Sequence, residues 1–170
     1  SSSGDTLLGI YSTRRLSDYD LDFYLLNGKL RERQHKDILG EDQRYSLGFR
    51  FGLDNELYTI DSEFIYQFGQ LKTSQRDYSV NAYTVANKVT RSFDSQNLKL
   101  GLSFNYASGD HDPNDGKIST FNAYFPRGNY FDEVALVGPS NFYNFSPYVV
   151  YKIKDSLSYT CNIDFFYRAS

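Results

Sequence analysis

Apolar side chains occupy every second position over long stretches of this 170-residue chain. Between residues 44 and 53 the odd-numbered positions are all Tyr, Leu or Phe, whereas the even-numbered positions are Arg, Ser or Gly. An amphipathic helix repeats its apolar positions at intervals of three and four, so it would not separate these two groups. The period of two therefore predicts a β-strand with one apolar and one polar face.

The same period recurs along the chain and predicts about eight strands of roughly ten residues, the length at which a tilted strand crosses a membrane. Three of these segments are weaker, because one is short, one is rich in Ala and Asn, and one carries apolar residues on both faces. Ser62 and Ile65 break the alternation of their segment. The expected strands are 7–12, 19–25, 44–53, 58–68, 80–89, 97–107, 145–154 and 157–168.

The connections between these strands alternate between short and long. The short ones are 13–17, 54–56, 91–96 and 155–156, and the long polar ones are 29–42, 69–79 and 108–144. Outer-membrane barrels show this asymmetry, with short periplasmic turns and longer external loops. We therefore predict an all-β, antiparallel, up-and-down transmembrane β-barrel, of which residues 1–170 form a single domain of about eight strands belonging to a larger barrel. The alternative is a soluble antiparallel sandwich with aromatic inward faces.

The composition is compatible with a barrel and argues against other classes of protein. No apolar run approaches the ~20 residues of a membrane helix. The mean hydropathy of −0.55 resembles that of a soluble protein, but strands that alternate between lipid and lumen also average to near neutrality. Aromatic residues make up 18% of the chain, with sixteen Tyr, and Tyr is enriched where a membrane meets water.

Charge and cysteine content remove two further classes. The formal net charge is −3, whereas a nucleic-acid-binding domain is usually basic. The single Cys161 cannot form a disulfide within the chain. The sequence contains no Met, so we interpret it as processed or as a fragment of a longer chain.

Charged residues on the polar faces of the predicted strands are the main functional candidates. Charge inside a narrow water-filled pore controls which ions and solutes pass. Arg would favour carboxylated solutes through its planar set of donors. The alternative is that these charges pair with one another and fill the lumen. The predicted pore-lining residues are Asp20, Asp22, Arg44, Arg50, Asp61, Glu63, Lys99, Asp164 and Arg168.

No catalytic motif is present, and we expect neither enzymatic activity nor a cofactor. His35 and His111 lie in different predicted loops, and neither a nucleophile elbow nor a zinc-protease motif occurs. A pairing of His111 with a loop Ser, as in an outer-membrane hydrolase, stays a minor alternative. Asp110, Asp112 and Asp115 are a weak calcium candidate, although Asp, Asn, Pro and Gly at this density are typical of Asx-turns.

Four sequence motifs resemble the alginate-export family of Gram-negative outer-membrane barrels. The resemblance is strongest over residues 97–170. The motifs are Tyr-Ala-Ser-Gly-Asp-His-Asp-Pro-Asn-Asp-Gly-Lys from Tyr106, Ser-Thr-Phe-Asn-Ala-Tyr-Phe-Pro-Arg-Gly-Asn-Tyr-Phe from Ser119, Gly-Pro-Ser-Asn from Gly138 and Tyr-Arg-Ala-Ser from Tyr167.

The resemblance implies a large monomeric barrel with an Arg- and Lys-rich lumen that exports a polyuronate across the outer membrane, with further strands on both sides of these residues. It implies an external loop that includes Asp110, Asp112, Asp115 and Arg127, and it matches Arg168 to a lumen Arg carried on a strand of the family. The expected partners are outer-membrane lipid, an anionic polysaccharide or small solute, and periplasmic export proteins. The acidic residues on the inward faces here rival the basic ones, which departs from the family pattern.

The function predicted from the sequence is passive, guided diffusion of an anionic polysaccharide such as alginate through an outer-membrane channel. A small-solute porin on the same fold is the nearest alternative. A soluble carbohydrate-binding sandwich, or a small closed barrel acting as an adhesin or membrane anchor, belongs to a different functional class.

Overall fold

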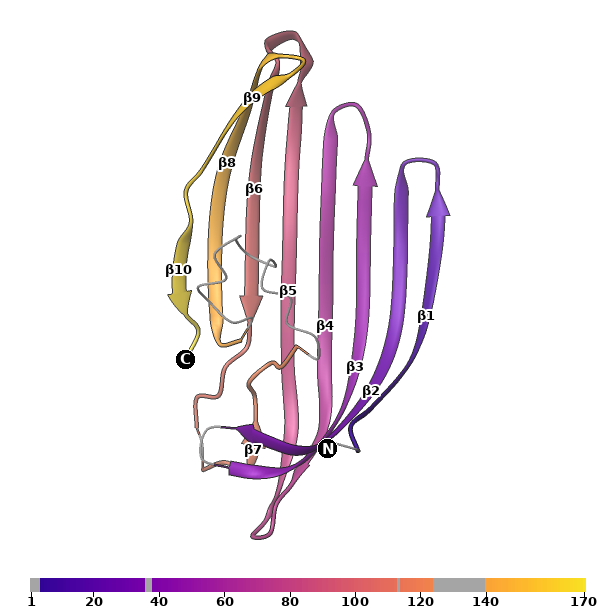
Figure 1. The fold of residues 1–170 in the computed structure, drawn as a ribbon, viewed down its shortest axis with the longest axis vertical. Helices are drawn as coiled ribbons and strands as arrows, with labels where there is room; N and C mark the ends of the chain where they lie inside the picture. The colour runs from indigo at the N-terminus through magenta and orange to yellow at the C-terminus, as the bar shows by residue number, and fades with distance from the viewer. Residues whose placement is uncertain (1–3, 36–37, 113, 124–139) are drawn as a thin grey trace.

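The chain forms one antiparallel ten-stranded sheet (Figure 1). The computed structural model describes residues 4–35, 38–112, 114–123 and 140–170. The elements are β1 (Thr6–Leu16), β2 (Tyr19–His35), β3 (Ile38–Asp54), β4 (Tyr58–Lys72), β5 (Asp77–Phe93), η1 (Asp94–Gln96), β6 (Leu98–Ala107), β7 (Lys117–Ile118), β8 (Phe142–Lys154), β9 (Leu157–Asn162) and β10 (Phe165–Arg168).

Strands that are consecutive in the sequence lie side by side in the sheet, in the order β1-β2-β3-β4-β5-β6-β8-β10. β9 and β10 pair with successive parts of β8, and only the two-residue β7 runs parallel to its partner β5. This arrangement confirms the predicted all-β, up-and-down fold. Among the described residues, β1 pairs only with β2, and β10 pairs only with β8, so the sheet is open rather than closed into a barrel.

The register places the period-two residues on opposite faces, as the sequence predicts. Phe23, Phe49 and Phe64 lie opposite one another on β2, β3 and β4, and the adjacent row contains Asp22, Arg50 and Glu63. We call the face with the three Phe residues the outer face and the face with Arg50 the inner face. Aromatic rings contact one another across the outer face, for example Phe23 and Phe49 at 5.0 Å between centroids.

The distribution of burial is inverted relative to a water-soluble protein. Leu47 and Phe23 on the outer face are 54% and 53% exposed, whereas Arg44 and Gln67 on the inner face are 2% and 1% exposed. A soluble sandwich would bury such an apolar face against a second sheet, but no second sheet packs on it within residues 4–35, 38–112, 114–123 and 140–170. A contiguous apolar face of this extent requires a lipid or protein covering.

The short turns lie near their predicted positions, all at the same end of the sheet (Figure 1), although residues 13–16 and 91–93 belong to β1 and β5. They connect β1 to β2, β3 to β4, β5 to β6 through η1, and β8 to β9. Two of the predicted long loops are wrong. Residues 29–42 and 69–79 are mostly strand, because the ladder continues to the pairs His35↔Ile38 and Lys72↔Asp77 despite the polar sequence.

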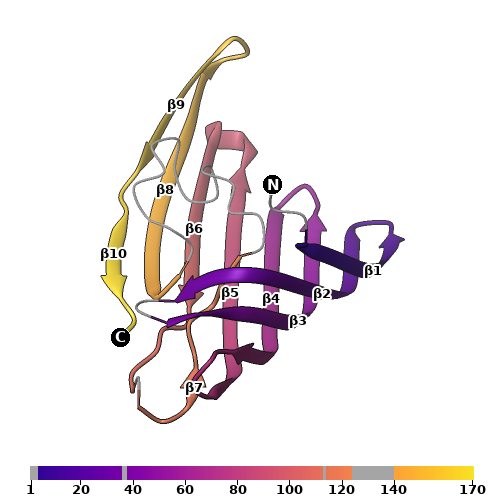
Figure 2. The same ribbon diagram turned by 60° about the horizontal axis from the view of Figure 1, so that its bottom comes forward.

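These extensions make β2, β3 and β5 17 residues long, more than the ~10 residues that cross a membrane. The ladder between β2 and β3 shifts register between Leu30 and Arg33. Beyond this irregularity the two strands bend across the sheet (Figure 2). Ile38 at the start of β3 consequently packs against a buried cluster of Leu71, Val80 and Ile118.

Leu47→Arg is expected to destabilise the protein in lipid, because it places a charge near the middle of the apolar outer face. The cost should be about 2–4 kcal/mol in the free energy of unfolding. Ala86→Arg is the matched control, since residue 86 lies on the inner face opposite Glu63. The measurement is urea unfolding of the full-length protein folded into lipid vesicles. Equal effects of the two substitutions would contradict the assignment of the faces.

Candidate functional site

A hollow of about 590 Å³ lies on the inner face. Its walls come from side chains that project from β1 to β6 on the polar side of the alternation, together with Phe121 and Ala123 of the segment that follows β6. The charged and tyrosine side chains that line it are Tyr11, Tyr24, Arg50, Asp61, Glu63 and Lys88. This hollow is a concave surface on which a solute could rest.

Arg50 is the central cation of the hollow, and acidic side chains hold it in place. Its Nε and one terminal nitrogen donate to the two carboxylate oxygens of Asp61 at 2.8 and 2.7 Å. Its other terminal nitrogen lies 3.9 Å from the nearer oxygen of Asp22. The side chains of Arg50 and Asp61 are both 47% exposed, so the pair faces the hollow. Because their charges are opposite, the pair presents little net charge to a solute. Of the two alternatives that the sequence left open, free inner charges or inner charges that pair with one another, Arg50 shows the second.

Three other cations on the inner face have no acidic partner among the residues that the structure describes. Lys88 lies 5.2 Å from the ring centroid of Tyr148. Lys99 lies opposite Ser92 and Val150 in the inner row nearest the short turns. Arg168 lies opposite Phe142 on β10, and all three are exposed. Sequence reasoning identified Lys99 and Arg168 but missed Lys88, whose position in a weakly alternating segment concealed its face.

Amides and hydroxyls cover the inner face of β6, β8 and the following strands. The Asn105 side chain donates to Asn144 at 2.8 Å, and Asn144 donates to Ser146 at 2.9 Å. Ser146 donates to Asp164, which also accepts from Asn162 at 2.7 Å. Asp164 thus lies on the predicted face but is tied into a network of neutral donors. The sequence signal for this network is the recurrence of Asn and Ser at alternate positions of the polar faces.

The segment after β6 turns back onto the inner face. β6 reaches β5 only as far as the pair Thr84↔Ala107. β7 then pairs with Ser79 and Val80 of β5, beyond the point where β6 ends. Farther along, Phe121 is buried against Ala82, Ala107 and Phe142.

Ser108 stabilises this turn through hydrogen bonds to Tyr83 and Ser119. Its backbone N–H donates to the Tyr83 carbonyl at 3.0 Å, and its hydroxyl accepts from the Tyr83 N–H at 2.9 Å. The same hydroxyl donates to the Ser119 carbonyl at 2.6 Å. The neighbouring Gly109 leaves room for Asn141 and Ser170, which a side chain at 109 would meet. Residues from all four motifs quoted above thus converge here, although residues 124–139 lie outside the described part of the chain.

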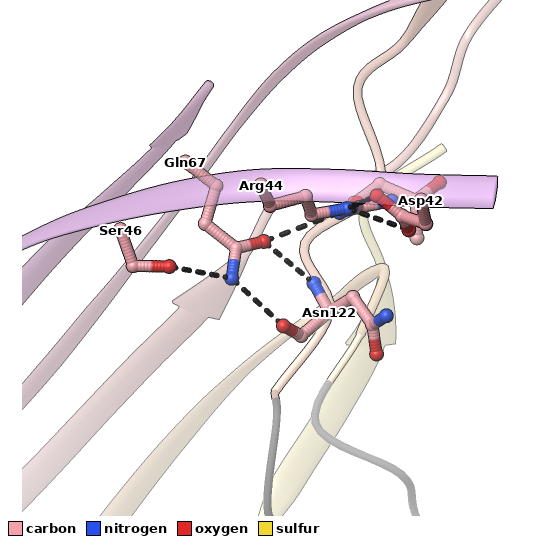
Figure 3. A network of polar contacts seen from close by, with 6 residues as sticks. Asp42, Arg44, Ser46, Gln67 and Asn122 are labelled. Atoms are coloured by element: carbon pink, nitrogen blue, oxygen red, sulfur yellow. Dashed lines mark hydrogen bonds and ion pairs between the residues drawn. The ribbon is translucent and has the colours of Figure 1, made fainter. Parts of the chain in front are cut away.

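A buried polar network fastens residues 120–122 to β3 and β4 (Figure 3). The Gln67 amide donates to the Asn122 carbonyl at 2.8 Å and accepts from the Asn122 N–H at 3.0 Å, as a neighbouring strand would. It also donates to Ser46 at 3.1 Å. Arg44 donates to the Thr120 carbonyl at 3.1 Å and to both carboxylate oxygens of Asp42 at 2.9 Å.

The network corrects the assignment of Arg44 as a pore-lining residue. Arg44 lies on the predicted face, but it is 2% exposed and is covered by the segment that it binds. Asp22 is similarly buried, at 6%. The alternation of the sequence gives the face of each residue, but it cannot show that a distant segment covers part of that face. Asp20, Asp61 and Glu63 stay accessible at the inner face.

The predicted external loop shows turn geometry. The carboxylates of Asp112 and Asp115 accept the N–H groups of Asn114 and Lys117 at 2.9 and 2.8 Å, which is the hydrogen bond of an Asx-turn. In the described part of the chain, no group of three or more His, Cys, Asp or Glu residues could hold a metal ion. The weak calcium assignment of Asp110, Asp112 and Asp115 therefore gains no support, and Arg127 lies outside the described residues.

Comparison with known proteins gives one match. A family model described as "Alginate export" matches residues 5–170. This match extends well beyond residues 97–170, where the motifs are concentrated. No curated protein matches the chain, and no solved structure does so.

Gln67→Ala is expected to loosen residues 117–123, because it removes the amide that binds both backbone groups of Asn122. The loss of these buried hydrogen bonds should cost about 1–3 kcal/mol. The measurement is backbone hydrogen exchange of residues 117–123 in the folded protein. Gln70→Ala is the matched control, since Gln70 lies on the opposite face of the same strand and is exposed. Unchanged exchange in Gln67→Ala would show that the apolar contacts alone hold the segment.

Proposed function

Because this chain belongs to the alginate-export family, we propose that its sheet forms part of the wall of an outer-membrane channel that passes an anionic polysaccharide by diffusion. The family is one of transport rather than of catalysis, and it assigns the chain a role in alginate export. The proposal adds the route, which is the inner face of the sheet. It also adds the mechanism, which is passive passage across the outer membrane of a Gram-negative bacterium.

The single observation that carries the proposal is the inverted burial of the two faces. One layer of strands presents an exposed apolar surface on one side and a polar, charged and hollowed surface on the other. A sheet of this kind is stable only when lipid covers the first surface and water the second. The wall of a membrane channel has this arrangement, with lipid on its apolar side and water on its polar side.

The exposed cations provide a means of guiding a polyanion. Lys88, Lys99 and Arg168 are exposed on the inner face without an acidic partner among the described residues. Conduction requires that each site attract the solute yet release it. Single ammonium or guanidinium groups in contact with water bind a carboxylate weakly, which meets that requirement. The segment at 114–123 narrows the passage, because it occupies part of the inner face.

A small-solute porin is the second candidate, and the pairing of Arg50 favours it. The most central cation is neutralised by Asp61 and lies close to Asp22. Glu63 adds further negative charge to the same side of the inner face, whereas Asp20 lies 4.0 Å from Arg15. A lumen with balanced charge would discriminate poorly between anions and cations.

The deciding experiment is the single-channel conductance of the full-length protein in a planar bilayer. An oligouronate and a neutral oligosaccharide of equal length are added in turn. A polyanion channel predicts current that the oligouronate interrupts more often and for longer. Equal indifference to both saccharides would support the porin, and the absence of any current would contradict both candidates.

Charge reversal on the inner face is expected to shift ion selectivity toward cations. A change of two unit charges acting over ~8 Å of water alters the energy of a passing ion by about 1 kcal/mol, or about fivefold in its local concentration at low salt. Arg50→Glu should have a larger effect than Arg168→Glu, because it also frees Asp61. The readout is the reversal potential in a salt gradient.

Arg91→Glu is the matched control, since Arg91 lies on the outer face opposite Tyr58 and Leu100. Its reversal potential should equal that of the wild-type protein. Selectivity that responds to Arg91→Glu as strongly as to Arg50→Glu would exclude the inner face as the conducting surface.

A further inference from the structure

The structure assigns a second kind of saccharide contact to the inner face, and we propose that Tyr11 and Tyr24 form a platform that binds an uncharged pyranose ring. The two residues lie opposite each other on β1 and β2. Their rings stack at 5.6 Å between centroids with an interplanar angle of 8°. This inference rests on the proposed function only in that the inner face must line a passage for saccharides.

Tyr24 is held in a fixed position. Its ring lies over Gly48, where even a Cβ atom would collide with it. Its hydroxyl donates to Glu63 at 2.7 Å. An aromatic ring that fills the space above a strand glycine is a known way of stabilising a sheet. Here it also gives a rigid base against which Tyr11 can stack, and a preorganised base lowers the entropic cost of binding.

Tyr11 presents the surface that a sugar would contact. Tyr24 covers one face of its ring, yet Tyr11 is still 59% exposed, so its exposed area lies on the opposite face and at the edge. Both rings line the hollow of about 590 Å³, which is large enough for a saccharide unit. A pyranose ring has a face of C–H groups, and such an apolar face packs well on an aromatic ring.

The polar groups around the platform favour hydroxyls over carboxylates. Asp61 and Glu63 line the same hollow, and their oxygens accept hydrogen bonds from sugar hydroxyls. Asp22 and Asp20 lie in the next two inner rows beside the tyrosines, with Asp20 4.0 Å from Arg15, and the cations that line the hollow are Arg50 and Lys88. The two cations and two carboxylates of the lining balance, so the hollow offers a carboxylated sugar no net attraction, whereas a neutral sugar needs none.

Two of the exposed cations lie away from the platform. Lys99 and Arg168 project from β6 and β10, whereas Lys88 of β5 lines the same hollow as the tyrosines. The inner face therefore offers a cationic surface suited to carboxylates and an aromatic, acid-rimmed surface suited to hydroxyls. A polymer that carries both kinds of group, or a mixed set of solutes, could use both surfaces.

The test uses the full-length protein in a planar bilayer with a neutral malto-oligosaccharide as the probe. We expect the wild-type current to show interruptions by this probe. Tyr11→Leu should shorten the interruptions about tenfold, because it removes the ring, whereas Tyr11→Phe should keep them within about twofold. Gly48→Ala should act like Tyr11→Leu, because it displaces Tyr24. Tyr159→Leu is the control on the outer face, where Tyr159 lies opposite Tyr151.

Two outcomes would overturn the platform without touching the proposed function. One is block by an oligouronate with no response to the neutral probe. The other is equal interruption in the wild-type protein, Tyr11→Phe and Tyr11→Leu. If no current is seen at all, the proposed function fails, and the platform is judged by titrating the detergent-solubilised protein calorimetrically with the same probe. Binding that survives Tyr11→Leu unchanged in that titration would overturn it.

Discussion

The backbone hydrogen-bond ladder is the constraint on which the rest of this structure depends. Inside a membrane no water can satisfy an N–H or C=O group, so the chain can cross only where each strand pairs with its neighbours. The ladder between β2 and β3 runs without a break from Tyr19↔Leu53 to Leu30↔Asp42. An unbroken ladder fixes the phase of alternation from strand to strand, because a slip of one residue would turn every side chain to the other face. The phenylalanine rows and the charged rows are therefore consequences of a single register.

The same constraint explains the folded segment after β6. The edge of β5 extends beyond the reach of β6, and unpaired strand edges expose donors and acceptors. β7, the hydroxyl of Ser108 and the carbonyl of Gly116 satisfy part of that edge, the last by accepting from the Ser79 N–H at 3.0 Å. Asp42 and Arg44 are buried beneath the segment with their charges paired. A buried charge pair is costly to break once it is covered, so the network favours one position of residues 120–122 over others.

Function in this fold follows from what the register leaves exposed on the inner face. Arg44 is buried, and pairing with Asp61 reduces the net charge of Arg50, so Lys88, Lys99 and Arg168 are the predicted or newly found inner-face cations that stay available to a solute among the described residues. The acidic residues concentrate on β2 and β4, and amides and hydroxyls cover β6 and β8. Under the proposed function, these regions contact a saccharide through its carboxylates at one place and through its ring and hydroxyls at another. The chain thus combines membership of the alginate-export family with an inner face on which acidic and basic residues occur together.

The sequence by itself determined the fold class, the faces of the strongly alternating strands and the approximate positions of the short turns. These follow from a period of two and from local turn residues, which act over only a few positions. Strand length was underestimated at 29–42 and 69–79, because polar side chains on a projecting hairpin resemble those of a loop. Only the tertiary structure decided that Arg44 is buried, that Lys88 faces inward, and that Tyr11 stacks on Tyr24. The Arg44 and Gln67 contacts join residues 76 and 55 positions apart, and such contacts depend on the path of a long connection and on register, neither of which a local pattern encodes.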